Sequence, residues 1–312
     1  MNRKKLGAAV VLIVCLCMVG SCYFTYERTI GLLRDEYENE LRIESGMISS
    51  SIDNHFLRPI TVAETVSKDV TMERIIKSST KEEAEAIETE AGEYLKSIRD
   101  GFGYAMVYAV SDETMAFFTE DGISGYLDPD NDERDHWYTA YQEKETEKIY
   151  QLNVDTDEIK DWELSVFINT GVFDKEGRFI GLCGVGVNMN EIQSMVERFE
   201  RIYDVKVDLI DKNGLIMVDS DITRIQKDVI EIDDLTLYSD GECYFEIGES
   251  GTRTITYMDE LGWYLVVQNQ GAMDTGIYSL LMPSIIIFMI GIILIIAVFV
   301  FQGISDNRRI NK

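Results

Sequence analysis

Two long uncharged stretches interrupt the alternation of apolar and polar residues along the chain. LGAAVVLIVCLCMVGSCYF covers residues 6–24, and LLMPSIIIFMIGIILIIAVFVF covers residues 280–301. A helix rises about 1.5 Å per residue, so each stretch is long enough to cross a hydrocarbon core of roughly 30 Å. Pro283 falls in the first turn of the second stretch, where a missing N–H costs least. We therefore predict transmembrane helices over residues 6–24 and 280–301.

Basic residues flank both stretches on the side away from the middle of the chain. Three lie within residues 1–5, and three lie within residues 302–312. Lys and Arg collect at the cytoplasmic ends of membrane spans. We therefore predict a cell-membrane protein with a cytoplasmic N-terminus at residues 1–5, a cytoplasmic tail at residues 302–312 and residues 25–279 outside the cytoplasm.

A cleaved signal sequence is the alternative for the first stretch. The basic start and the small residues of VGSC, which resembles a lipobox ending at Cys22, are compatible with cleavage. The apolar run is long for a signal sequence, however, and a helical pattern follows it without a break. We favour an uncleaved anchor.

Helical spacing continues beyond the first stretch. A long amphipathic helix is predicted over residues 28–57, because apolar residues recur there every three, four or seven positions, at Ile30, Leu33, Tyr37, Leu41, Ile48, Ile52 and Phe56. Such a stripe is also suited to pairing with a second copy of the chain, so we expect a homodimer through this helix. A second helix is predicted to begin at Thr80, which forms a capping pattern with Glu83.

Two sets of strand-like segments follow, which predicts an α+β fold. The larger unit, residues 80–188, includes YAMVYAV and a hairpin whose turn lies between Asp174 and Gly177. A helix from Asn190 to about Arg201 leads out of it. The smaller unit, residues 204–275, opens on VKVDLID and the hairpin signal Asn213-Gly214, and it ends directly before the second apolar stretch.

Charge separates the middle of the chain from its ends. The ends hold 6 of the 29 Lys and Arg residues and 1 of the 56 Asp and Glu residues, so the middle has 23 basic and 55 acidic residues and a net charge of −32. A surface this acidic repels nucleic acid and anionic lipid. We therefore exclude nucleic acid as a partner.

The candidate chemistry does not point to an enzyme. The two histidines, His55 and His136, lack the neighbours that a metal site or catalytic triad needs, and we predict no cofactor. The acidic run DPDNDERDHWYT begins like a calcium loop but lacks its glycine and its closing glutamate. Cys183 and Cys243 are the cysteines outside the predicted membrane region. They either form one disulfide or remain two buried thiols, and we favour the thiols.

Several motifs between the two predicted spans carry a family resemblance. They are FLRPITVAETVSKDV, the Trp-Tyr pair of RDHWY, FINTGVFDKEGRFIGLCGVGVN and VDLIDKNGLIMVDSD. With them, residues 25–275 resemble the double Cache sensor domain of bacterial transmembrane receptors. The resemblance implies a long N-terminal helix and two tandem PAS-like antiparallel sheets. It also implies a small-molecule site in the outer unit and a dimer that signals through the membrane.

The resemblance also bears on the ligand. Amino-acid-sensing members place an Arg two residues before the Trp-Tyr pair and an Asp in a GVxGxD strand. Here Asp135 occupies the first position, with Arg134 one step earlier, and Gly186 occupies the second. Moving an Arg by one residue along an extended segment turns its fork to the opposite face. We therefore expect a small polar or cationic ligand rather than an α-amino acid.

The expected ligand-binding residues come from the segments around this motif. Trp137 and Tyr138 offer ring faces with N–H and O–H donors, and Asp135 offers a carboxylate for a cation or a hydroxyl. The others are expected to flank the pocket: Tyr126, Tyr150, Asn153 and Asn169. The alternative is that the Trp-Tyr pair belongs to the core. Asp155 and Asp157 are expected to lie in solvent.

Receptors with such an outer domain usually continue into a histidine kinase, a diguanylate cyclase or a chemotaxis signalling helix. The tail QGISDNRRINK resembles the start of a linker to a kinase or cyclase and lacks the proline that opens a HAMP helix pair. We predict a sensor that acts through its second span, with a separate cytoplasmic kinase or cyclase as a candidate partner. A truncated or split receptor without an output domain, and a tethered binding module that does not signal, are the alternatives.

Overall fold

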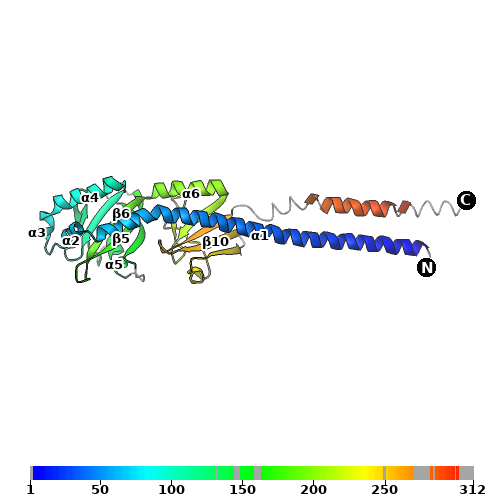
Figure 1. Ribbon diagram of the computed structural model, residues 1–312, viewed down its shortest axis with the longest axis horizontal. Helices are drawn as coiled ribbons and strands as arrows, with labels where there is room; N and C mark the ends of the chain where they lie inside the picture. Colours follow the sequence, from blue (N-terminus) through cyan, green and yellow to red (C-terminus); the bar gives the residue numbers. More distant parts are fainter. Residues whose placement is uncertain are drawn as a thin grey trace. The chain divides into compact units, whose positions relative to one another are not determined.

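A computed structural model provides the structure of the protein. It describes residues 3–130, 133–143, 148–157, 163–248, 251–269, 282–283, 285–298 and 300–301. The chain divides into two compact units. One consists of Glu44–Glu246 with Arg253–Gln268, and the other consists of Met1–Ile43, Ile247–Thr252 and Asn269–Lys312. The first of these units contains most of both sheets (Figure 1).

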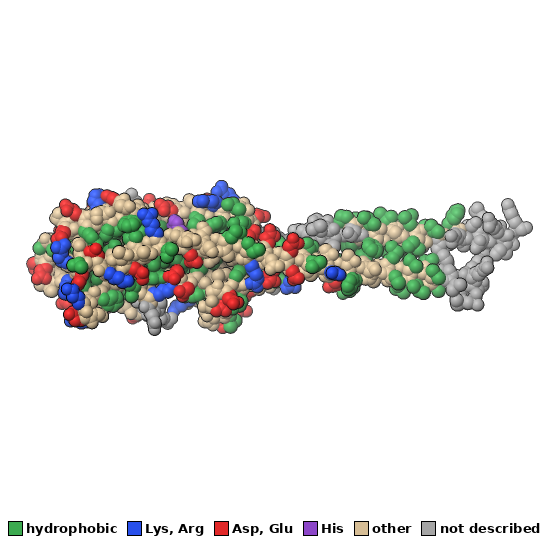
Figure 2. All heavy atoms as spheres, in the orientation of Figure 1, with side chains coloured by type: hydrophobic (Ala, Val, Ile, Leu, Met, Phe, Trp, Pro, Cys, Tyr) green, Lys and Arg blue, Asp and Glu red, His purple; other side chains and the backbone are tan. Residues whose placement is uncertain are grey.

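A single helix, α1 (Arg3–Ser67), joins the first predicted span to the long amphipathic helix. Within the described residues, the part from Ala9 onward is the one helix long and apolar enough to cross a membrane. Its most apolar window has a mean hydropathy of 2.1 and is not buried. A shorter apolar helix covers Ile285–Val298, inside the second predicted span. Figure 2 shows hydrophobic side chains along these apolar helices.

The long helix continues ten residues beyond the predicted end at residue 57, and Pro59 lies inside it. A proline removes one helical hydrogen bond and clashes with the preceding turn, which disfavours a continuous helix at this position. The helix continues because its buried stripe continues. Phe56 has no exposed surface, and Ile60, Ala63 and Val66 keep the stripe buried after the proline.

The first sheet has six strands in the order β3-β2-β1-β6-β5-β4, all paired antiparallel. They are β1 (Met106–Ser111), β2 (Ala116–Thr119), β3 (Gly122–Tyr126), β4 (Tyr150–Asp157), β5 (Glu163–Phe173) and β6 (Phe179–Asn188). We call residues 70–188 the first sheet unit. Its sheet contacts α2 (Val70–Ile76) and α4 (Glu88–Phe102), while the short η1 (Glu133–Asp135) leads into α5 (His136–Gln142).

The predicted helix from Thr80 divides into α3 (Lys81–Ala86) and α4 at Ile87. Thr80 caps α3 as expected, because its hydroxyl accepts a hydrogen bond from the Glu83 N–H at 3.2 Å. The Glu83 carboxylate accepts from the Ser79 N–H at 2.8 Å, one residue earlier than in a capping box. An ideal Cβ built on Gly92 of α4 would lie 3.1 Å from the Glu120 carbonyl oxygen, so this helix packs tightly on the sheet.

The helix α6 (Met189–Tyr203) follows β6 and is capped by the Asn188 side chain. The second sheet has the order β8-β7-β11-β10-β9. Its strands are β7 (Val205–Ile210), β8 (Ile216–Val218), β9 (Cys243–Gly248), β10 (Gly251–Met258) and β11 (Trp263–Asn269). We call residues 205–269 the second sheet unit.

Both predicted hairpin turns form. At the first, the Asp174 carboxylate accepts hydrogen bonds from the N–H groups of Glu176 and Arg178, and Gly177 adopts a φ of 78°. At the second, Gly214 adopts a φ of 81°, which glycine tolerates without steric cost. The α+β class and the two antiparallel sheets are therefore confirmed.

Candidate functional site

A cavity of about 180 Å³ lies in the first sheet unit. Its lining comes from β1 to β5 and from the segment that leads into α5. The lining residues are Met106, Tyr108, Phe117, Ser124, Gly125, Tyr126, Leu127, Arg134, Asp135, Trp137, Asn153, Asp155, Thr156, Phe167 and Asn169. α5 packs on the same face of the sheet, because Tyr138 and Tyr141 share a core cluster with Met106, Tyr108 and Val110.

The strand register explains the cavity floor. Asn153 pairs with Phe167, and Phe167 pairs with Gly186. Alternate residues of a strand share a face. Asn153 and Asp155 on β4 therefore point to the same face as Phe167 and Asn169 on β5.

Three of the other aromatic rings in the described lining are grouped around Tyr108. The Tyr108 ring lies 5.6 Å from that of Phe117, 5.8 Å from that of Trp137 and 6.0 Å from that of Phe167, measured between centroids. The contacts with Trp137 and Phe167 are edge-to-face, the geometry that ring quadrupoles favour. These rings give the cavity an apolar, aromatic wall.

Tyr108 is held in place from two sides. Its hydroxyl donates a hydrogen bond to Asn169 Oδ1, and both side chains are buried. Gly184 on β6 leaves the space that the Tyr108 ring occupies, because an ideal Cβ there would lie 2.5 Å from Tyr108 Cζ. Burial raises the pKa of Tyr108 well above its ordinary value, and the neighbouring Cys183 and Asp155 raise it further.

Asp135 and Arg134 form an ion pair in the cavity lining. Arg134 Nε donates to Asp135 Oδ1 at 3.1 Å, and the Asp128 N–H donates to Asp135 Oδ2 at 2.8 Å. Asp135 is only 2% exposed, whereas the Arg134 side chain is 53% exposed. The carboxylate at the position where amino-acid sensors place an arginine is therefore already neutralised by the arginine beside it.

Gly186 stands where the GVxGxD strand of amino-acid sensors has its aspartate. An ideal Cβ at Gly186 would lie 2.9 Å from Phe167 Cε1 and 3.2 Å from Phe167 Cδ1. The Phe167 ring thus occupies the space that a side chain at position 186 would need. No carboxylate can project from this position without displacing the ring.

Asp155 was expected in solvent, and the structure corrects this expectation. Asp155 is partly buried and lines the cavity. Burial raises the pKa of its carboxyl, while the hydrogen bond from the Thr156 N–H, at 2.7 Å, lowers it. Sequence reasoning missed it because DTDE looks like an acidic loop, whereas β4 extends through Asp157 and turns Asp155 onto the floor. The side chain of Asp157 lies outside the described residues.

The other predicted site residues divide into two groups. Tyr126, Asn153 and Asn169 line the cavity together with Asp135 and Trp137. Tyr138 lies in the core instead, 1% exposed, and its hydroxyl donates to Asp112 Oδ1 at 2.7 Å. Tyr150 also lies outside the lining that the structure describes.

Tyr150 instead belongs to a set of contacts between β4 and the second sheet unit. Its hydroxyl donates to the Glu260 carboxylate in the β10–β11 turn. Lys148, which lies just before β4, donates from Nζ to Asp259 Oδ2 at 2.8 Å. Farther along the same strand, the Gln226 side chain donates to the backbone carbonyl of Val154. The strand that supplies Asn153 and Asp155 to the cavity therefore also contacts the second sheet unit, at its start and near its middle.

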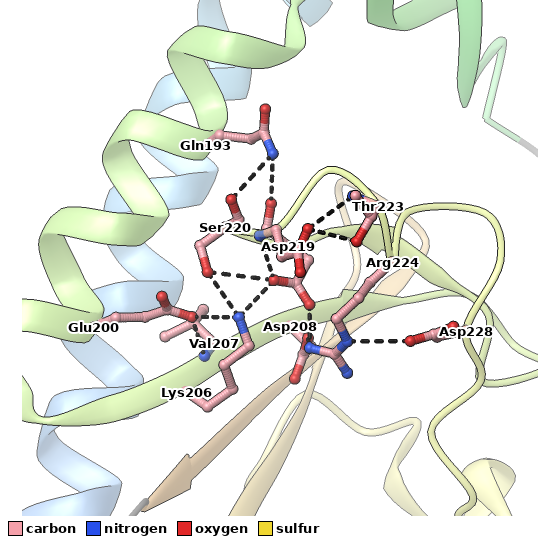
Figure 3. A network of polar contacts seen from close by, with 11 residues as sticks. Gln193, Glu200, Lys206, Val207, Asp208, Asp219, Ser220, Thr223, Arg224 and Asp228 are labelled. Carbon is pink, nitrogen blue, oxygen red and sulfur yellow. Dashed lines mark hydrogen bonds and ion pairs between the residues drawn. The ribbon is translucent and has the colours of Figure 1, made fainter.

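A second polar cluster ties α6 to the second sheet (Figure 3). Lys206 Nζ donates to Glu200 Oε1 at 2.8 Å and to Ser220 Oγ at 2.7 Å, and it also contacts Asp219. Arg224 bridges Asp219 and Asp208, lying 3.1 Å from Asp208 Oδ1. We call this set the Asp208–Asp219 network. The Asp208 and Asp219 side chains are at most 3% exposed, so their charges depend on these partners.

The pKa values of Asp208 and Asp219 are shifted in opposite directions. Burial, followed by the hydrogen bond with Asp219, raises the pKa of Asp208 to about 7. Burial also opposes ionisation of Asp219, but hydrogen bonds from Asp208, the Asp221 N–H and Lys206 lower its pKa. Asp208 is therefore the proton donor of the pair at mildly acidic pH.

We predict a pH-dependent effect of Asp208→Asn. Asp208 has a raised pKa in the folded state, so its contribution to stability is fully present below the unfolded pKa and is lost as pH rises to about 7. Asparagine does not titrate. The difference in free energy of unfolding, variant minus parent, should therefore be at least about 1 kcal/mol larger at pH 7.5 than at pH 5. Urea denaturation at both pH values measures this gain, and a constant difference would contradict it.

The remaining candidates are the two cysteines and the acidic run. Cys183 on β6 and Cys243 on β9 are free thiols in different sheets. Among the described residues, no group of three or more His, Cys, Asp or Glu side chains is arranged to hold a metal ion. Asp132 of the calcium-like run lies outside the described residues.

Solved structures with the same fold are sensory domains of bacterial chemoreceptors. The sensory domain of Tlp3 from Campylobacter jejuni matches with a TM-score of 0.54 and 12% identity, over 80% of this chain and 99% of its own. The PctC domain from Pseudomonas aeruginosa, in complex with GABA, matches at 0.52 and 12%, over 74% and 98%. The CtaA domain from Pseudomonas fluorescens, in complex with L-isoleucine, matches at 0.52 and 14%, over 80% and 98%. At these identities the likeness concerns the fold.

A family profile identifies the chain itself. The dCache_1 profile, described as a Cache domain, matches residues 32–272, which is most of the chain. The matched region includes α1 from residue 32 onward, both sheets and the cavity. The two tandem sheets and the long N-terminal helix agree with that match. The chain belongs to the Cache domain family of sensor domains.

Proposed function

We propose that this chain is a membrane-bound extracytoplasmic sensor. A small molecule binds in the cavity of the first sheet unit, and the second sheet unit passes the change to the apolar segment at residues 280–301. The observation that carries the proposal is the double role of β4. It supplies Asn153 and Asp155 to the cavity and also contacts Gln226 and Glu260 of the second sheet unit.

The proposed membrane arrangement has two spans, with both termini in the cytoplasm. Leu12 and Leu16 of α1 are more than half exposed, which suits a lipid environment. Gly291 of the shorter apolar helix approaches α1, since its ideal Cβ would lie 3.3 Å from Met18 Cε. Protease added to intact cells tests this arrangement, and protection of residues 25–279 would contradict it.

Transmission needs only a difference in ligand affinity between two conformations of the receptor. A tenfold preference for one conformation supplies about 1.4 kcal/mol, and two sites in a dimer supply twice that. The route we propose runs from β4 to the Glu260 turn and along β11, which ends at Asn269 shortly before the second span. Crosslinking near Leu280 with and without ligand tests it, because a binding module that does not signal would show no change.

Dimerisation is supported by the outward face of α1. Leu32, Ile43, Met47 and Leu57 are 45–63% exposed and lie within one narrow arc of the helix, opposite the buried stripe of Ile48 and Ile52. An exposed apolar stripe of this length fits a second copy of the same helix. A separate cytoplasmic kinase or cyclase is the proposed reader of the dimer. Mass measurement of the detergent-solubilised chain tests its dimeric state.

The test of ligand binding is a thermal-shift screen of the full chain in detergent against small metabolites. A ligand at a hundred times its dissociation constant should raise the free energy of unfolding by about 2.7 kcal/mol. Trp137→Ala should abolish the shift, because it removes the ring that contacts both Tyr108 and Phe117. Phe102→Ala is the matched control, since Phe102 is 42% exposed and lies outside the cavity lining.

Two results would count against this site. If Phe102→Ala and Trp137→Ala lose the shift equally, binding lies elsewhere. If Trp137→Ala unfolds the protein, the ring belongs to the core, and Asn153→Ala then decides the question. Asn153 is partly exposed and lines the cavity, so its truncation should weaken binding and leave the fold intact.

A further inference from the structure

The described lining of the cavity has more acidic than basic side chains. Three charged residues belong to this described lining, namely Arg134, Asp135 and Asp155. Arg134 and Asp135 are paired with each other, with Arg134 Nε 3.1 Å from Asp135 Oδ1. Asp155 has hydrogen bonds from the Thr156 N–H and from Asn153, and the described residues place no Lys or Arg beside it. The described lining therefore carries one carboxylate without a cationic partner.

The surroundings of Asp155 are those of a binding group rather than a surface carboxylate. Asp155 lines the same cavity as Tyr108, Phe117, Trp137 and Phe167, and its charge raises the pKa of the buried Tyr108. A partly buried carboxylate costs free energy unless a cation neutralises it. The faces of Tyr108, Phe117, Trp137 and Phe167 attract organic cations through the ring quadrupole.

A ligand carboxylate, in contrast, would meet one cation in the described lining, Arg134, which is already paired with Asp135. The Arg134 fork already holds Asp135 through Nε and Nη2, and Asp135 also accepts the Asp128 N–H. A ligand carboxylate would have to displace a 2% exposed carboxylate from this arrangement. The position of the ammonium-binding aspartate of amino-acid sensors is covered by the Phe167 ring.

We propose that the cavity binds a small monocationic amine with an apolar body and no carboxylate, and that Asp155 is its anchoring and specificity-determining residue. The proposal rests on the proposed function, since it names the ligand class of the same site. The ammonium group would lie between the Asp155 carboxylate and the ring faces. The apolar body would fill the space beside Met106 and Leu127.

The experiment compares two matched sets of probes by calorimetry on the full chain in detergent. Each set contains an amino acid, the amine that lacks its carboxylate and the acid that lacks its ammonium. The sets are isoleucine, 2-methylbutylamine and 3-methylpentanoate, and phenylalanine, 2-phenylethylamine and 3-phenylpropanoate. We expect at least one amine to bind more than about tenfold tighter than its amino acid, and neither acid to bind.

Asp155→Asn should weaken binding of that amine about ten- to a hundredfold, the range for a charged hydrogen bond. Asp121→Asn is the matched control, because Asp121 is exposed in the β2–β3 turn and undergoes the same change of charge. Asp155→Asn should leave the melting temperature without probe unchanged or higher, since it removes a partly buried charge. This readout separates lost binding from lost folding.

Three results overturn the proposal. They are an amino acid or acid that binds as tightly as its amine, amine binding that survives Asp155→Asn, and the failure of both amines to bind. In each case the proposed function stands if the metabolite screen finds another compound whose shift depends on Trp137. The proposed function fails together with the amine proposal only if no compound in the screen gives a thermal shift that depends on Trp137.

Discussion

Asp219→Ala should lower the free energy of unfolding by about 3 kcal/mol, the lower end of the range for breaking a buried ion pair. Asp219 receives hydrogen bonds or ion pairs from Lys206, Arg224 and the Asp221 N–H, and its side chain has no exposed surface. Alanine leaves two cations with fewer partners. Urea denaturation of the detergent-solubilised chain, followed by tryptophan fluorescence, measures the loss.

Asp228→Ala provides the control on the same arginine. The Asp228 carboxylate lies 3.3 Å from Arg224 Nε, but its side chain is 55% exposed. Water screens such a pair, so we expect a loss below about 1 kcal/mol. Similar losses in the two variants would show that the Asp208–Asp219 network does not hold α6 to the second sheet. The Gln193 amide, which donates to the Asp219 carbonyl at 3.0 Å, would then be the main polar link.

Gly184→Ala should destabilise the first sheet unit by about 2 kcal/mol and remove ligand binding. The added Cβ would lie 2.5 Å from Tyr108 Cζ and 2.7 Å from the Ile168 carbonyl oxygen. The carbonyl belongs to the sheet and cannot move aside, so the Tyr108 ring must leave its place in the cavity wall. Its hydrogen bond to Asn169 would break as well. Denaturation and the thermal-shift assay measure the two effects.

Gly125→Ala is the matched change within the same lining. Gly125 lies on β3, where an added Cβ has nothing within 4 Å and φ is not left-handed. We expect its free energy of unfolding to stay within about 0.5 kcal/mol of the parent value. If Gly184→Ala were equally mild, the close packing of β6 under Tyr108 would not be what shapes the cavity.

The fold could be predicted from the sequence because its signals are local. The stripe from Ile48 to Phe56, the turn at Asp174 and Gly177 and the dipeptide Asn213-Gly214 each reflect a short-range geometric requirement. The predicted helix end at residue 57 was wrong, because the helix continues through Pro59, a residue that is a local signal against helix. The buried residues after it, from Ile60 to Val66, outweigh that signal through packing.

The cavity could be predicted only in part, because register and packing decide which side chains face it. Trp137, Asn153 and Asn169 fell in segments that the family resemblance marked, and they line the cavity. Tyr138 is one residue from Trp137, but α5 turns it into the core towards Asp112. Asp155 was missed because its side of β4 follows from pairing with β5, which no local pattern reveals.

The free thiol of Cys183 gives the sensing unit an internal reporter. Its side chain has no exposed surface, and β6 is flanked by β1 and β5 on its two edges. The Cys183 side chain alternates with Leu182 and Gly184 and so projects from the face of the sheet opposite the cavity, where α2 packs, and a thiol reagent reaches it only when this packing opens. The rate of its modification therefore reports how often the packing on the far side of the sheet from the cavity opens. Purification under reducing conditions leaves this reporter intact, since no disulfide joins it to Cys243.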